Sequence, residues 1–125
     1  MKIADQLLAH LTRSGWEQTD VNDERDDWFL DEYWVMKSVR ANWGVEIHIS
    51  FLVDPMWEGP RRKGQGLWVI MASHQLPTTF NQAPGRSRTL RLGGRGVFAR
   101  LDGFVSEIES LREDSGLETS EGDSR

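Results

Sequence analysis

The sequence predicts an α+β domain: a two-layer sandwich in which a mainly antiparallel sheet of roughly four to six strands carries an N-terminal and a C-terminal helix on one face. Helical patterns at both ends of the chain enclose several segments of alternating or continuous apolar residues. Strands that follow one another through turns favour antiparallel pairing. We therefore expect a single domain over residues 1–112 and a disordered acidic C-terminal tail over residues 113–125.

The clearest strand covers residues 43–54, WGVEIHISFLVD, in which every odd position is apolar up to residue 53. Side chains of a strand alternate between the two faces of a sheet, so the odd positions predict a buried face beneath both helices. The even positions carry Glu46, His48 and Ser50. A shift of one residue would expose the whole apolar set, so the register of this strand is strongly determined.

Both helices are predicted from apolar residues that repeat at helical spacing. Residues 2–14 end at Ser14-Gly15, because glycine commonly terminates a helix, and residues 97–112 carry the most regular apolar stripe. Gly103 lies inside the second helix, where glycine costs up to about 1 kcal/mol relative to alanine. We expect Gly103 to mark close packing of this helix on the sheet.

Four further segments are predicted to complete the sheet. They are a candidate edge strand at 16–21, a strand pair or one long bent strand at 28–39, a central strand covered on both faces at 67–73, and a short last strand at 88–92. Proline and glycine predict long loops at 55–66 and 74–86.

The composition is that of an ordinary globular chain, and no apolar run approaches the roughly 20 residues that span a bilayer. Cysteine is absent, which excludes disulfides, thiol nucleophiles and cysteine-based zinc sites. Asp5 interrupts the apolar stretch that a signal peptide would need. We therefore expect a cytoplasmic protein without a membrane partner.

The net charge of −5 is unevenly distributed along the chain. Residues 59–101 contain eight basic residues and no acidic one, whereas the segments before and after them are acidic. Two interpretations remain open. Either the acidic elements neutralise the basic middle within the folded domain, or the asymmetry marks an electrostatic binding surface.

The favoured function is a protein-interaction module that binds a protein partner or itself, as in a homodimer. Large apolar residues on both faces of 67–73 predict an open apolar sheet face, which would serve as a homodimer interface or a pocket wall unless loops 55–66 and 74–86 cover it. The acidic and aromatic region 16–34 could instead steer and anchor a basic partner. The candidate partner-binding residues are Trp28, Tyr33, Trp34, Glu46, His48 and Trp68.

A small-molecule pocket or active site around His48 is the first alternative. Glu46, His48 and Ser50 combine the residue types of an orienting carboxylate, a base and a nucleophile. Neighbours on one strand face lie about 6.5–7 Å apart, which strains hydrogen bonds among them, so no catalytic residue is assigned. The histidines are scattered without metal-ligand spacing, and we expect neither a metal nor a cofactor.

Weak binding of nucleic acid or another anion is the second alternative. Trp57 lies near three bases in the loop 55–66, and Gly93-Gly94-Arg95-Gly96 precedes a helix without a capping side chain. The overall acidity of the chain disfavours nucleic acid as a partner. The candidate anion-binding residues, within segments 61–63 and 86–95, are Arg61, Arg62, Lys63, Arg91 and Arg95.

Overall fold

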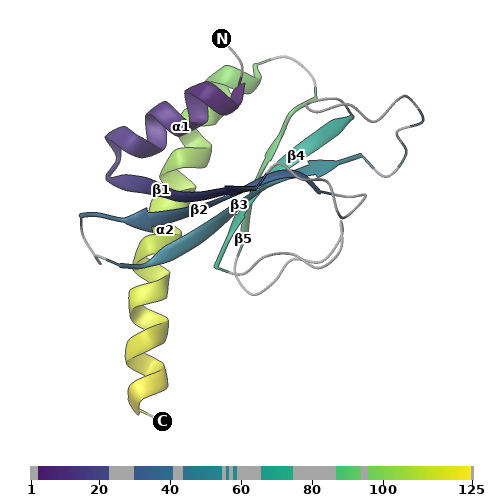
Figure 1. The fold of residues 1–125 in the computed structure, drawn as a ribbon. Coiled ribbons are helices and arrows are strands. Elements are labelled where there is room, and N and C mark those ends of the chain that lie inside the picture. Colours follow the sequence, from purple (N-terminus) through teal and green to yellow (C-terminus); the bar gives the residue numbers. More distant parts are fainter. Residues whose placement is uncertain are drawn as a thin grey trace.

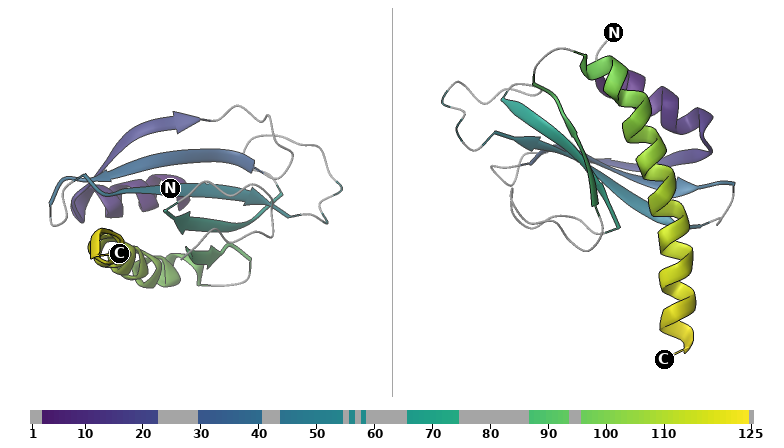
Figure 2. Two further views of the ribbon diagram at one scale, coloured as in Figure 1. Left: turned by 90° about the horizontal axis from the view of Figure 1, so that it is seen from below. Right: turned by 180° about the vertical axis from the view of Figure 1, so that it is seen from behind.

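The fold is seen in a computed structural model that describes residues 3–22, 30–40, 44–54, 56, 58, 66–74, 87–93 and 96–124, with side chains described as far as residue 112. The elements follow in the order α1 (Ile3–Arg13), β1 (Trp16–Asn22), β2 (Leu30–Ser38), β3 (Glu46–Val53), β4 (Leu67–Ser73), β5 (Ser87–Arg91) and α2 (Val97–Ser124). The strands form one antiparallel sheet in chain order, and both helices lie on the same side of it (Figures 1 and 2). The predicted α+β architecture is confirmed.

The main core lies between the two helices and the odd residues of β3. Ile47, Ile49 and Phe51 are almost fully buried, and they belong to one cluster with Leu11 of α1 and Leu101 of α2. Burying each such side chain contributes roughly 1.5–3 kcal/mol before the loss of chain entropy is subtracted. The register predicted from the alternation of β3 is confirmed.

Irregular pairing interrupts the alternation at three places in the sheet: between β1 and β2, between β2 and β3, and between β3 and β4. In β2 the register shifts between Leu30 and Glu32, so the predicted pair or bent strand is a single irregular strand. In β4 the partner of Leu52 is Val69 and the partner of Val53 is Leu67, which leaves Trp68 as an extra residue. An extra residue of this kind changes the direction of the side chains around it.

Arg112 joins α2 to the turn between α1 and β1. Its guanidinium lies 4.3 Å from the centre of the Trp16 ring and donates hydrogen bonds to the main-chain oxygen of Ser14 at 2.9 Å and to Glu109 at 2.6 Å. Glu109 also accepts a 3.1 Å hydrogen bond from Trp16 Nε1. Gly15 permits this turn with a φ of 89°, a conformation that side chains rarely adopt. One side chain therefore ties together three elements.

The second helix continues to Ser124, beyond the end predicted at residue 112. Its last turns extend past the sheet (Figure 1). Once a helix is nucleated, each added residue forms a main-chain hydrogen bond without any tertiary contact, so the end of the apolar stripe did not mark the end of the helix. Neither helix, over the residues described, has the length and hydropathy needed to cross a bilayer.

The helix-free face of the sheet is buried where its apolar residues gather. Leu30, Leu52, Val69 and Met71 form a second cluster against which Tyr33 packs. These four side chains are at most 9% exposed, so the open apolar face predicted at 67–73 is not present there. The loops 55–66 and 74–86, predicted as its alternative cover, lie almost entirely outside the described residues.

Candidate functional site

One edge of the sheet is formed by β5, a strand that carries Arg88 and Arg91. Among the described strands, only β4 pairs with β5, which is therefore an edge strand. Leu92 donates its N–H to the oxygen of Trp68 on β4 at 2.9 Å. Hydrogen bonding alternates along an antiparallel strand, so the main-chain groups of Thr89 and Arg91 point away from β4. Such a row of outward N–H and C=O groups is a template for another strand.

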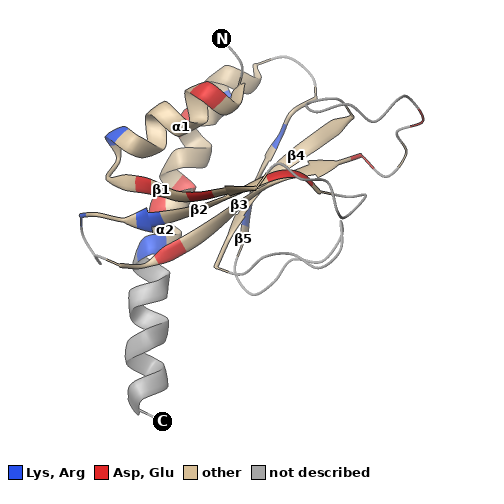
Figure 3. Cartoon of the chain, viewed as in Figure 1, with Lys and Arg blue, Asp and Glu red and all other residues tan. Residues whose placement is uncertain are grey.

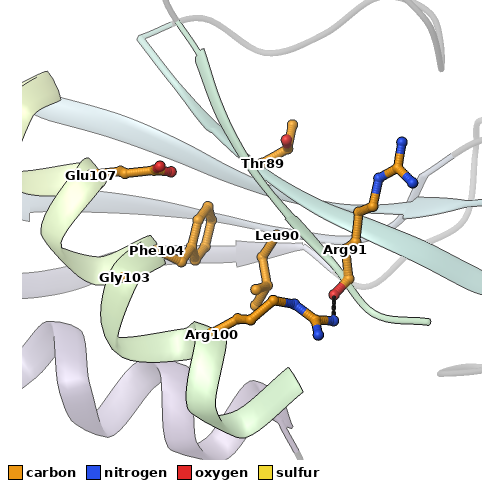
Figure 4. Close-up of a pocket in the computed structure, with 7 residues that line it drawn as sticks. All are labelled: Thr89, Leu90, Arg91, Arg100, Gly103, Phe104 and Glu107. Atoms are coloured by element: carbon orange, nitrogen blue, oxygen red, sulfur yellow. Dashed lines mark hydrogen bonds between the residues drawn. The ribbon is translucent and has the colours of Figure 1, made fainter. Parts of the chain in front are cut away.

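A pocket of about 360 Å³ lies between this edge and α2 (Figure 4). Leu90 and Phe104, both nearly fully buried, contribute its apolar part. Glu107 points from α2 toward Thr89, so the rim is polar. The other lining residues are Arg91, Arg100 and Gly103. We call the β5 edge together with this pocket the β5–α2 groove.

Gly103 leaves the β5–α2 groove open. It is exposed, and a Cβ atom built on it would meet no neighbouring atom within 4 Å. The prediction that Gly103 marks close helix–sheet packing is therefore wrong. The neighbouring Phe104 makes the contact with the sheet instead, because it lies on the apolar stripe of the helix and Gly103 lies beside that stripe.

Arg100 reaches from α2 to the free edge of β5. Its Nη2 donates to the main-chain oxygens of Arg91 at 2.8 Å and of Gly93 at 3.1 Å. In Figure 4 the Arg91 side chain extends away from Arg100, so only its carbonyl takes part in this contact. The guanidinium thereby occupies acceptor groups at one end of the edge.

A second pocket, of about 260 Å³, adjoins the same strand and is lined by Trp68, Val69, Arg91 and Gly93. Trp68 is 37% exposed, which is unusual for so large an apolar side chain in a sheet. The structure thus brings together Trp68, predicted to bind a partner, and Arg91, predicted to bind an anion. Both residue types are enriched where protein interfaces derive most of their affinity.

The other predicted partner-binding residues do not form one surface. Trp34 is 2% exposed and packs edge-on against Phe51 at 5.0 Å, inside the main core. Glu46 is exposed at the start of β3. The described residues do not include Trp28, predicted to bind a partner, or four of the residues predicted to bind an anion: Arg61, Arg62, Lys63 and Arg95.

His48 and Tyr33 lie together on the helix-free face, where their rings stack with centroids 6.1 Å apart. Ser50 pairs across the sheet with Tyr33 and is fully buried. Neither Ser50 Oγ nor His48 Nδ1 has a hydrogen-bond partner in the part of the chain that is described. His48 therefore does not act on Ser50 as the base of a nucleophile, and the three-residue arrangement of Glu46, His48 and Ser50 is not assembled.

Acidification is expected to destabilise the fold through His48. Burial lowers the pKa of His48 below its ordinary value of 6.5; nearby Glu46 raises it in part, and His74 lowers it further. The unfolded chain then takes up a proton more readily than the folded one. The contribution of neutral His48 to the free energy of unfolding is therefore fully present above about pH 6.5. It is lost as the pH drops through the lowered pKa.

The test of this pH dependence is urea unfolding at pH 7 and pH 5. The free energy of unfolding should fall more steeply with acid in the wild type than in the His48→Gln variant, which has no titrating ring. Equal losses in the two proteins would contradict the role of His48.

The β5–α2 groove was not predicted from the sequence as a whole. Arg91 was predicted to bind an anion and Trp68 to bind a partner, each for its own reason. On α2, the unusual position of Gly103 inside a helix was the feature of the sequence that pointed to this site. No group of three or more histidine or acidic residues within the described ranges could hold a metal ion. Comparison of the chain with known protein families, with curated proteins and with solved structures finds no significant match.

Proposed function

We propose that the protein is an interaction module that receives an extended segment of a protein partner along the free edge of β5. The observation that carries this proposal is the position of the outer β5 edge, with which no other described strand pairs, between two pockets, one toward α2 and one toward Trp68. In strand addition, main-chain hydrogen bonds give affinity and pockets for alternate side chains give specificity. The β5–α2 groove supplies both.

The charge of the edge favours an acidic partner segment. Arg88 and Arg91 lie on β5, Arg100 lies beside it, and β5 carries no acidic residue (Figure 3). The opposite edge strand, β1, carries Glu17 and Asp20. An acidic segment is therefore attracted to β5 and repelled by the carboxylates of β1, which steers it to one edge of the sheet.

The helix-free face supports the interaction function less well than the edge does. Its apolar cluster is already buried, so little apolar surface remains there for a partner to cover. Trp34 is likewise unavailable within the core.

Hydrogen exchange with a model peptide tests the proposal. A short capped peptide, Thr-Thr-Glu-Thr-Val-Thr-Thr, combines strand-forming residues with one carboxylate and one apolar side chain. We expect it to slow exchange of the Thr89 and Arg91 amides, which point outward. The Leu90 amide points toward β4 and should be protected with or without peptide, so it is an internal control.

Two substitutions at Gly103 distinguish binding of the peptide in the groove from binding elsewhere on the protein surface. Gly103→Leu places a large side chain in the groove and should abolish the protection of Thr89, whereas Gly103→Ala should preserve it. Both replacements are expected to raise helix stability by up to about 1 kcal/mol, so unfolding cannot explain a loss of binding. Equal peptide binding by the two variants, or no protection of Thr89 in the wild type, would refute the proposal.

A further inference from the structure

Arg100 and an added strand would compete for the same main-chain acceptor. The guanidinium of Arg100 holds the carbonyl of Arg91, which belongs to the outward row that a new strand would pair with. A partner N–H that takes over this carbonyl leaves Arg100 without that hydrogen bond. Arg100 is exposed, so its side chain is able to turn toward the partner.

We infer that Arg100 selects a partner segment with a carboxylate side chain facing α2 at the Arg91 end of the groove, exchanging its hydrogen bonds to carbonyl groups for that carboxylate. The inference rests on the proposed function, since it requires strand addition at β5. A guanidinium presents its donors as a planar fork that matches a carboxylate better than it matches separate carbonyl oxygens. An amide side chain at the same place would leave Arg100 with a weaker partner.

The spacing along α2 specifies the next recognised position as well. Phe104 lies four residues after Arg100, a rise of about 6 Å along the helix. Side chains on one face of a strand repeat every 6.5–7 Å or so. A segment whose carboxylate faces Arg100 therefore places its next α2-facing side chain over Gly103 and Phe104, where the pocket is open and apolar.

At the other end of the groove, near Thr89, the preference for charge is reversed. Glu107 points into the groove beside Thr89, about two turns from Arg100. A second carboxylate facing α2 at that end would meet like charge, which is unfavourable in a partly desolvated site. The groove thus favours one direction of the charge pattern: carboxylate near Arg91, apolar side chain in the middle, and a neutral or basic side chain near Thr89.

Titration of two peptides against three proteins tests the inference. The peptides are the glutamate peptide above and the same peptide with glutamine in place of glutamate; the proteins are the wild type, Arg100→Gln and Arg13→Gln. Arg13 is an exposed arginine on α1, so its replacement gives the same change of net charge away from the groove. The wild type and Arg13→Gln should bind the glutamate peptide about tenfold more tightly than the glutamine peptide.

In Arg100→Gln the preference for glutamate should fall to roughly twofold, because only longer-range attraction remains. An equal preference for glutamate in Arg100→Gln and wild type would overturn the role of Arg100. So would equal binding of both peptides by the wild type, although protection of the Thr89 amide would then still support edge binding. If neither peptide protects Thr89 in any protein, the proposed function itself fails.

Discussion

Replacing Phe104 by alanine is expected to lower the free energy of unfolding by about 3–5 kcal/mol, the usual effect of removing a buried aromatic side chain. Phe104 is 2% exposed and packs within the main core cluster between α2 and the sheet. Its removal deletes apolar contacts and leaves a cavity that the surrounding strands cannot fully close. Urea unfolding of the wild type and the variant measures this difference directly, provided that the slope of the free energy of unfolding against urea concentration is the same in both.

Phe98 provides the matched control for this experiment. It lies on the same helix but is 48% exposed, and Phe98→Ala should change stability by no more than about 0.5 kcal/mol. Similar losses in the two variants would mean that the packing of α2 on the sheet is not as described. Phe104 also lines the β5–α2 groove, which is why the binding tests above use Gly103 instead.

Arg112→Met is expected to cost about 2–4 kcal/mol, the second large effect. Arg112 is 5% exposed, and its guanidinium bridges Glu109 on α2 and the carbonyl of Ser14 at the α1–β1 turn. Methionine retains part of the packing against Trp16 but supplies no donor. The Ser14 carbonyl and the Glu109 carboxylate then lose charge-assisted hydrogen bonds at one partly buried site.

Arg112→Lys tests whether the positive charge of Arg112 or the planar shape of its guanidinium stabilises the fold. Lysine keeps the positive charge but is unable to stack as a plane on Trp16 while donating to Ser14 and Glu109, so an intermediate loss is expected. Arg13→Met, at an exposed position, should cost at most about 1 kcal/mol. Wild-type stability of Arg112→Lys in chemical unfolding would show that charge alone matters here.

Local periodicity was enough to predict most of the fold. The odd residues of β3 are buried beneath both helices because alternation along a strand is a property of the backbone itself. The start of α1, the turn at Gly15 and the apolar stripe of α2 follow in the same way from spacing within one element. Charge also predicted a basic segment that includes Arg91.

Periodicity failed where the sheet is irregular or where both faces of a strand are apolar. Trp34 was expected on a binding surface, but the register shift after Leu30 and the aromatic residues on both faces of β2 concealed which face it occupies. Trp68 is the extra residue of an irregular pairing, and no spacing rule locates such a residue in advance. These positions are determined by pairing between strands rather than by the strand alone.

The sequence by itself thus determined the fold class, the buried face of β3 and the two helices, because each depends on a repeat within a single element. Only the tertiary structure brought together the residues of the proposed binding site. The β5–α2 groove exists because α2 packs beside the edge strand and brings Arg100, Gly103 and Glu107 next to residues 89–91. That juxtaposition depends on the burial of Leu90 against Phe104. The spacing of residues within β5 or within α2 does not predict this contact, because it forms between two elements.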